Sequence, residues 1–422
     1  MNIYFQFIIF YIIYNEIKST PIIFPFKTIN KDSSKLFIDY LINNYIYTNI
    51  NLGIPNQNIL SIITFNTSFL YIPGKKYNSD YNEEKSTSFI KRNKDLIYFF
   101  HEPIISGFLS NETFKFKNYN NKEIIYKQFP FILNNNSTNE NLNKFGILGL
   151  KIHEDIILKD NSFTFYLKEL NIINDEIFTI KYDKNNDNEG LIIFGEYPHE
   201  YEKNKNNYFQ SKIKNSFAIG RNWLIGLNNL TYGNIEISIE KAIYINIEIG
   251  VIFAPLTFID YIDKFFFNIL IQEQKCFKNI YLDLYIYYVC NDNVEINKFK
   301  DLNFYILDLN YTFVLNYKDI FLLHENKFYF LILFDKKNGF FWKFGKPFLK
   351  KYQLVFNSYR KTIGFYHNDN SNFNISYFIL IFLFILLFLI IVFIILKKKN
   401  DNKKKKHATE LIEEINQNKL LD

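Results

Sequence analysis

The sequence has few of the residues from which many functional sites are built. Its 422 residues include two cysteines, one methionine, two tryptophans and 14 glycines. It contains no glycine-rich phosphate loop, no G-x-S-x-G nucleophile elbow and no recognisable cysteine nucleophile. Histidine precedes glutamate at His101, His153, His199 and His324, but none of these pairs has the second histidine that a zinc-binding helix needs. We therefore expect no metal and no cofactor.

A broad basic surface is also lacking, although the formal net charge is +6. Seven of the positive charges lie in two lysine runs near the C-terminus, 397–399 and 403–406. The remainder of the chain is close to neutral, so we expect no binding to nucleic acid.

Both ends of the chain carry apolar segments. Residues 4–14 are apolar but too short to span a bilayer, and polar residues and Ser19 follow, so 1–19 is predicted to be a signal peptide. No Lys or Arg precedes this run, which leaves a buried first strand as the alternative. Between residues 20 and 35 no typical basic pro-segment stands out, and whether a propeptide is removed stays open.

The second apolar segment, Tyr377–Leu396, has no charge, glycine or proline. Twenty helical residues span the hydrocarbon core of a bilayer, which is about 30 Å thick. Positive charge stays on the cytoplasmic side. We therefore predict a transmembrane helix at 375–396 and a basic cytoplasmic tail at 397–422. The chain would be a single-pass type I protein of the secretory pathway or cell surface, with its N-terminal part lumenal or extracellular.

In such a compartment the two cysteines, Cys276 and Cys290, are expected to form a disulfide, with two free thiols as the alternative. Closing a loop of this size contributes about 3 kcal/mol. The sequon N-x-[ST] predicts candidate glycosylation sites at Asn111, Asn135, Asn136, Asn229 and Asn310, and it also occurs at Asn66 and Asn374.

The lumenal region has the pattern of short strands. Segments such as 45–54, 61–72, 190–197 and 242–253 are rich in Ile, Phe and Tyr and are separated by polar breaks. The better helical candidates are 163–171 and 256–270. From the strand pattern we predict a mostly antiparallel all-β protein. Because a region of this length suits two hydrophobic cores, we predict two lobes, at 20–205 and 206–370.

Several motifs resemble the pepsin-like aspartic proteases, in the order in which that family has them. They are YTNINLGIPNQN (47–58), SIITFNTSFLYIP (61–73), SGFLSNETF (106–114), FGILGL (145–150), GLIIFGEYP (190–198), Trp223, AIYINIEIGVIFAP (242–255) and WKFGKPFLKKYQLVF (342–356). The resemblance implies two β lobes related by pseudo-twofold symmetry, a cleft for a polypeptide between them, and a hairpin flap above the cleft.

That family uses two aspartates that share one proton, each from a D-[TS]-G-[TS] loop. Counting back from Pro73 and Pro255 puts Thr64 and Asn246 at the aspartate positions, and Asn66 and Glu248 at the loop glycines. Phe100 stands at the tyrosine of the flap. Neither Thr nor Asn can act as a general base near neutral or acidic pH.

Two hypotheses follow. The first is a membrane-anchored, monomeric pseudoprotease that binds a polypeptide without cleaving it. The alternative is a divergent, active aspartic-type endopeptidase in which a nearby carboxylate, with Glu248 as a weak candidate, replaces a lost aspartate. A lone glutamate without a partner is expected to be an ordinary loop residue. A glycan on Asn66 would block the cleft, although Asn66 is expected to be unmodified.

Overall fold

The structure is a computed structural model that describes residues 20–28, 36–99, 104–137, 143–152, 162–202, 208–212, 222–237, 241–337, 341–366, 384–390, 392–394 and 396–399. The chain divides into two units, Met1–His367 and Asn368–Asp422. The predicted signal peptide at 1–19 lies outside the described residues.

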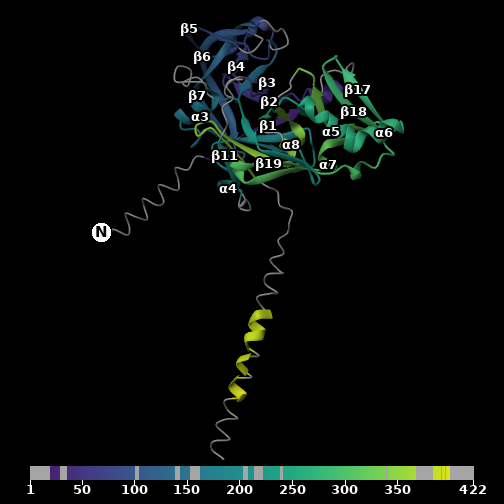
Figure 1. Ribbon diagram of the computed structural model, residues 1–422. Coiled ribbons are helices and arrows are strands. Elements are labelled where there is room, and N and C mark those ends of the chain that lie inside the picture. Colours follow the sequence, from purple (N-terminus) through teal and green to yellow (C-terminus); the bar gives the residue numbers. More distant parts are fainter. Residues whose placement is uncertain are drawn as a thin grey trace, which may run out of the picture. The chain divides into compact units, whose positions relative to one another are not determined.

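The first half of the larger unit consists mainly of strands, with a few short helices (Figure 1). Its elements are β1 (Ile22–Thr28), α2 (Phe37–Ile42), β2 (Ile46–Leu52), β3 (Gln57–Thr64), β4 (Leu70–Pro73), β5 (Ile90–Phe99), β6 (Ile104–Asn118), β7 (Glu123–Ser137), β8 (Gly146–Gly149), α3 (Phe163–Glu169), β9 (Ile177–Tyr182), β10 (Glu189–Phe194) and α4 (Pro198–Tyr201).

The second half is built in the same way. Its elements are β11 (Tyr208–Lys212), β12 (Leu224–Leu227), β13 (Asn229–Tyr232), β14 (Ile235–Ile237), β15 (Lys241–Ile245), β16 (Ile252–Ala254), α5 (Ile259–Ile262), α6 (Asn268–Gln272), β17 (Cys276–Tyr281), β18 (Tyr285–Asn291), β19 (Leu302–Ile306), β20 (Tyr311–Leu315), α7 (Tyr317–Ile320), β21 (Phe321–His324), β22 (Lys327–Phe330), β23 (Ile332–Asp335), β24 (Trp342–Phe344), α8 (Lys346–Lys351), β25 (Gln353–Asn357) and β26 (Thr362–Tyr366). The mostly β prediction is confirmed, and both predicted helical segments are helical, the second as a series of short turns.

One arrangement of four strands occurs in each half of the chain, which supports the two-lobed prediction. In the first, β3 pairs in parallel with β8, β8 pairs antiparallel with β4, and β4 pairs in parallel with β7. In the second, β15, β24, β16 and β23 pair in the same order and the same directions. The loops after β3 and β15 therefore occupy equivalent places in the two lobes.

The two lobes share one sheet, which contains strands from both sides of the predicted boundary at residue 205. Thirteen strands run in the order β11-β26-β25-β9-β10-β1-β2-β3-β8-β4-β7-β6-β5. The last two strands of the larger unit, β25 and β26, thus join the first lobe through β9. A nine-stranded and a four-stranded sheet complete the second lobe.

Residues before the family-like motifs are built into this shared sheet. Strand β1 pairs with β10 on one side and β2 on the other. Its Phe24 and Phe26 are 3% and 1% exposed and pack in the main hydrophobic core. Burying two phenylalanines is worth several kcal/mol, so this segment contributes to the stability of the fold.

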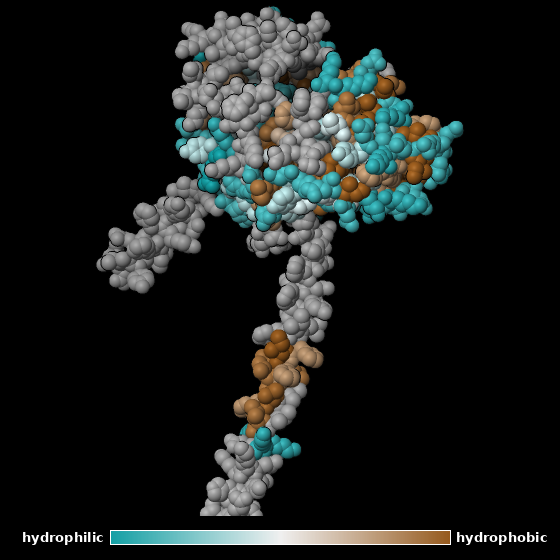
Figure 2. All heavy atoms as spheres, viewed as in Figure 1, coloured by the Kyte–Doolittle hydropathy of each residue, from teal (hydrophilic) through white to brown (hydrophobic). Residues whose placement is uncertain are grey.

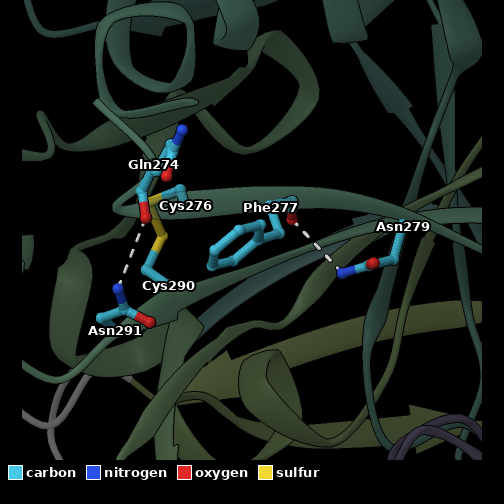
Figure 3. The surroundings of a disulfide bond; sticks show 6 residues. All are labelled: Gln274, Cys276, Phe277, Asn279, Cys290 and Asn291. Atoms are coloured by element: carbon cyan, nitrogen blue, oxygen red, sulfur yellow. Dashed lines mark hydrogen bonds between the residues drawn. A yellow bond between two sulfur atoms is a disulfide. The ribbon is translucent and has the colours of Figure 1, made fainter. Parts of the chain in front are cut away.

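The predicted disulfide is confirmed. Cys276 and Cys290 are bonded and lie opposite each other on β17 and β18 (Figure 3). Nearby, the side-chain amide of Asn291 donates to the carbonyl oxygen of Gln274 at 3.5 Å. The bond therefore closes the open end of a hairpin whose strand β17, within the part of the chain that the structure describes, pairs only with β18.

The smaller unit is helical at 384–390, 392–394 and 396–399. Its apolar side chains are exposed, as the brown spheres in Figure 2 show, with Phe384 79% and Phe393 68% exposed. Within the described residues, no helix has both the length and the apolar character needed to cross a membrane. Much of the predicted span 375–396 lies outside those residues, so the anchor stays a prediction.

Candidate functional site

Thr64 and Asn246 occupy equivalent positions, as the sequence predicts. Thr64 is the last residue of β3 and Asn246 directly follows β15, the equivalent strand of the second lobe. Each side-chain oxygen accepts a hydrogen bond from the backbone N–H two residues on. The Asn66 N–H donates to Thr64 Oγ1 at 3.0 Å, and the Glu248 N–H donates to Asn246 Oδ1 at 2.8 Å. The two turns, 64–67 and 246–249, form what we call the two-loop site.

A glycine from the neighbouring strand segment supports each turn. A Cβ at Gly149 would lie 2.5 Å from the carbonyl oxygen of Thr67, and a Cβ at Gly345 would lie 2.2 Å from that of Ile249. Real Cβ atoms do not come so close to backbone oxygen, so only glycine permits this approach. This explains why the motifs at 145–150 and 342–345 each contain a glycine.

Buried residues hold the two turns in place. Phe65 and Ile247, the second residues of the turns, are 2% and 0% exposed. The ring of Trp223 packs 6.2 Å from that of Phe65, and its indole N–H donates to the carbonyl oxygen of Leu150 at 2.9 Å. Residues of the second lobe thereby fix the turn of the first.

Glu248 lies at the centre of the two-loop site. Its carboxylate accepts a hydrogen bond from the Thr64 hydroxyl. The side-chain amide of Asn66 donates to both carboxylate oxygens, at 2.8 Å and 3.1 Å. The side chain that replaces one loop glycine thus connects the two turns, and the expectation that Glu248 is an ordinary loop residue is not met.

Burial raises the pKa of the Glu248 carboxyl above its ordinary value, because removal from water disfavours the charged form. Hydrogen bonds from Thr64, Asn66 and the backbone of Phe65 act in the opposite direction. The ionised carboxylate of Glu248 also affects two nearby tyrosines. Burial raises the pKa values of Tyr45 and Tyr244, and the negative charge of Glu248 adds to both shifts.

The described residues place one carboxylate in this site. No other Asp or Glu of the described part is hydrogen-bonded to Glu248 or perturbs its pKa. Nor do the described residues contain a group of three or more His, Cys, Asp or Glu suited to a metal ion. The geometry therefore offers a single titrating acid with neutral hydrogen-bond donors around it.

The flap prediction is met only in part. Strands β5 and β6 pair as a hairpin, with Phe99 opposite Ile104. Phe100, the predicted flap residue, lies outside the described residues.

The sequon asparagines differ in their environments. Asn310 is exposed in a left-handed turn, whereas the Asn111 side chain is 4% exposed within β6, so a glycan there would have to displace packed neighbours. The Asn229 amide donates to Glu236 at 2.8 Å. The side chains of Asn135 and Asn136 lie outside the described part. Glycosylation at all five positions stays a prediction.

Comparisons with known proteins agree with this geometry. A sequence profile described as eukaryotic aspartyl protease matches residues 45–368, and the chain belongs to that family. Basic 7S globulin from soybean has a similar structure, with a TM-score of 0.62 and 13% sequence identity over 84% of this chain and 98% of that one. A search of curated protein sequences finds no match. The fold is therefore that of the two-lobed pepsin-like proteins.

Proposed function

We propose that this chain is a membrane-anchored pseudoprotease that binds a polypeptide in the groove between its lobes without cleaving it. The observation that carries the proposal is the two-loop site. The two positions that would hold the catalytic pair are Thr64 and Asn246, and the one nearby carboxylate, Glu248, is hydrogen-bonded to Thr64 and Asn66.

The chemistry of peptide hydrolysis in this family explains why one carboxylate is not enough. Two carboxyl groups about 3 Å apart share a proton, so that one is ionised and the other neutral. The ionised group removes a proton from water while the neutral one polarises the scissile carbonyl. A single acid can take only one of these roles at a time. Thr64 does not replace the second acid, because an alcohol hydroxyl is a far weaker proton donor than a carboxyl group and the Thr64 hydroxyl already donates to Glu248.

A binding experiment tests the proposal. Fluorescently labelled, denatured casein is titrated with the full chain in detergent, and anisotropy reports binding. The variant Asn66→Trp places a large ring at an exposed position of the two-loop site, and we expect it to weaken binding about tenfold. Asn310→Trp, which also removes a sequon at an exposed turn, is the matched control. Equal affinity of all three proteins, or no saturable binding, would contradict the proposal.

Glu248 favours a second candidate, a divergent active endopeptidase. Its carboxyl is central, and its raised pKa is a feature of catalytic acids. On this hypothesis acid-dependent cleavage of casein would disappear in Glu248→Gln. It would persist in Glu273→Gln, a control at a half-exposed side chain that pairs with Lys275 on the surface.

The anchor and the location belong to the same proposal. The uncharged run 377–396, the lysines that follow it and the exposed apolar side chains of its described helical residues support a single-pass type I protein. The disulfide is consistent with a lumenal or extracellular domain, in the secretory pathway or at the cell surface. We expect the full chain to sediment with membranes after alkaline washing and a chain ending at residue 370 to be released. Release of both would contradict the anchor.

A further inference from the structure

A pocket of about 590 Å³ lies in the second lobe, where it meets the N-terminal segment. Helix α2 forms one wall, and α7, β21 and α8 form others. The turn between β9 and β10 completes it through Asp187 and Asn188. Helix α2 precedes residue 45, where the match to the protease family begins. One wall of the pocket is therefore formed by residues that precede the segment matched by the family profile.

Lysines dominate the charged part of the lining. The charged lining consists of four lysines and two aspartates: Lys318, Lys346, Lys350, Lys351, Asp187 and Asp319. Each aspartate is already paired: Lys350 with Asp187, and Lys351 with Asp319 at 2.6 Å.

Lys346 and Lys318 have no carboxylate partner among the described residues. Lys346 Nζ donates a hydrogen bond to the side-chain oxygen of Asn188 at 3.0 Å. Because this oxygen is neutral, the bond does not balance the positive charge of Lys346. Burial lowers the pKa of Lys346 to about 8, and the nearby charge of Lys350 adds to the effect, while Asp187 opposes it. A bound anion would offset both effects, because a nearby negative charge stabilises the charged form of Lys346.

Apolar side chains form another part of the lining, beside polar residues such as Thr28, Tyr40 and Asn44. Leu41, Phe321 and Leu331 are buried, and the exposed side chains of Leu322 and Leu323 extend the same surface. Phe37 of α2 stacks on His324 of β21, with ring centroids 3.6 Å apart. The volume exceeds what an inorganic anion fills, so the cationic and apolar walls together fit a larger molecule.

We propose that this pocket binds a small organic anion, in which a phosphate or carboxylate group pairs with Lys346 and Lys318 while an apolar body packs against the leucines and Phe321. Charge-assisted hydrogen bonds orient the anionic group, and apolar burial supplies much of the affinity. The pocket adjoins the second turn of the two-loop site, because the Lys346 backbone N–H donates to the carbonyl oxygen of Ile249 at 2.9 Å. The side chains assigned to the anion are not those of the two-loop site, and the inference does not depend on whether the chain cleaves peptides.

Chemical labelling tests the proposal in the unaltered full chain. Lys346 is acetylated by a mild amine reagent near pH 8, and peptide mass spectrometry follows its labelling rate and that of the exposed Lys327. We expect millimolar phenyl phosphate to slow labelling of Lys346 several-fold and to leave Lys327 unchanged. Benzoate in place of phenyl phosphate tests whether a carboxylate group protects Lys346 as well as a phosphate group does. Inorganic phosphate, which lacks the apolar body, should protect Lys346 much less than phenyl phosphate. Failure of both organic anions to protect Lys346 would overturn the proposal.

Calorimetric titration with phenyl phosphate provides the second measurement. Lys346→Met removes the charge but keeps much of the length, and we expect it to weaken binding about tenfold. Lys346→Arg should retain most of the affinity, and Lys327→Met should equal the unaltered protein. Protection of Lys346 without a loss of affinity in Lys346→Met would also contradict the assignment.

Discussion

The carboxylate of Glu248 joins the two turns of the two-loop site, at the position where the sequence motif predicts a glycine of the family to be replaced. A glycine there leaves open space between the turns, whereas Glu248 fills that space and uses the Thr64 hydroxyl and the Asn66 amide as donors. The four residues 64, 66, 246 and 248 of two short motifs therefore place one acid among neutral groups in this site.

The raised pKa of Glu248 gives a prediction about stability and pH. A carboxyl whose pKa is higher in the folded than in the unfolded state stabilises the fold at low pH, and this stabilisation is lost as pH rises through the folded-state value. Relative to the unaltered protein, Glu248→Gln should therefore gain stability as pH rises from about 4 to about 7. Thermal unfolding of both proteins across that range measures the difference. A difference independent of pH would contradict the account of Glu248.

The glycine that supports the second turn provides another test at this scale. Gly345→Ala places a Cβ against the carbonyl oxygens of Ile249 and Val251, and neither backbone atom can move without shifting the turn. We expect a loss of about 1–3 kcal/mol in the free energy of unfolding, measured by urea titration. Gly149→Ala should behave alike, because Gly149 meets Thr67 in the same way. A neutral effect of both changes would contradict the equivalence of the turns.

At the scale of elements, the strand pattern predicted much of the fold. Segments rich in Ile, Phe and Tyr, 45–54 and 190–197, located β2 and β10. The segments 61–72 and 242–253 each ran from one strand across a turn into the next, from β3 into β4 and from β15 into β16. The pattern did not identify the pairing of β1 between β2 and β10, or of β25 with β9, since such contacts join segments far apart in the chain. Counting from the two prolines did locate the equivalent turns, because each turn has the same length in both lobes.

The hairpin β17–β18 depends on its disulfide. Cys276 and Cys290 close it at the end opposite its turn, and among the described strands β17 has no second neighbour in the sheet. Replacing both cysteines by serine should lower the free energy of unfolding by about 3 kcal/mol. The shift of the thermal midpoint measures this loss, and reduction of the unaltered protein should reproduce it. No shift in either case would show that packing alone holds the hairpin.

Strand β1 belongs to the folded protein rather than to a dispensable leader. Phe26 is 1% exposed, and its ring packs 5.2 Å from that of Tyr182 in β9. Phe26→Ala should destabilise the fold by about 3–5 kcal/mol, and denaturant unfolding measures it. The nearby exposed Pro25→Ala is the control. A small effect of Phe26→Ala would indicate that the sheet is stable without β1.

At the scale of the whole molecule, the sequence and the structure agree on the class of fold. They differ on Glu248, which the sequence analysis treats as an ordinary loop residue and which the structure places between the two turns. The turns at 64–67 and 246–249 could be found by counting along the motifs. The contacts of Glu248 could not, because they depend on how closely two turns separated by about 180 residues approach. The lysine pocket was not predicted for a similar reason: α2 and α8 come together only in the folded chain.

The most direct test of the central claim is a search for peptide-bond cleavage. The full chain, in excess over a mixture of denatured proteins, is incubated at steps from about pH 3 to about pH 7, and mass spectrometry records new peptide termini, with pepsin as the positive control. Because the described site has one carboxylate instead of two, we predict no termini above those of a protein-free sample at any pH. New termini that appear at acidic pH, disappear with pepstatin and are absent from Glu248→Gln would contradict the account.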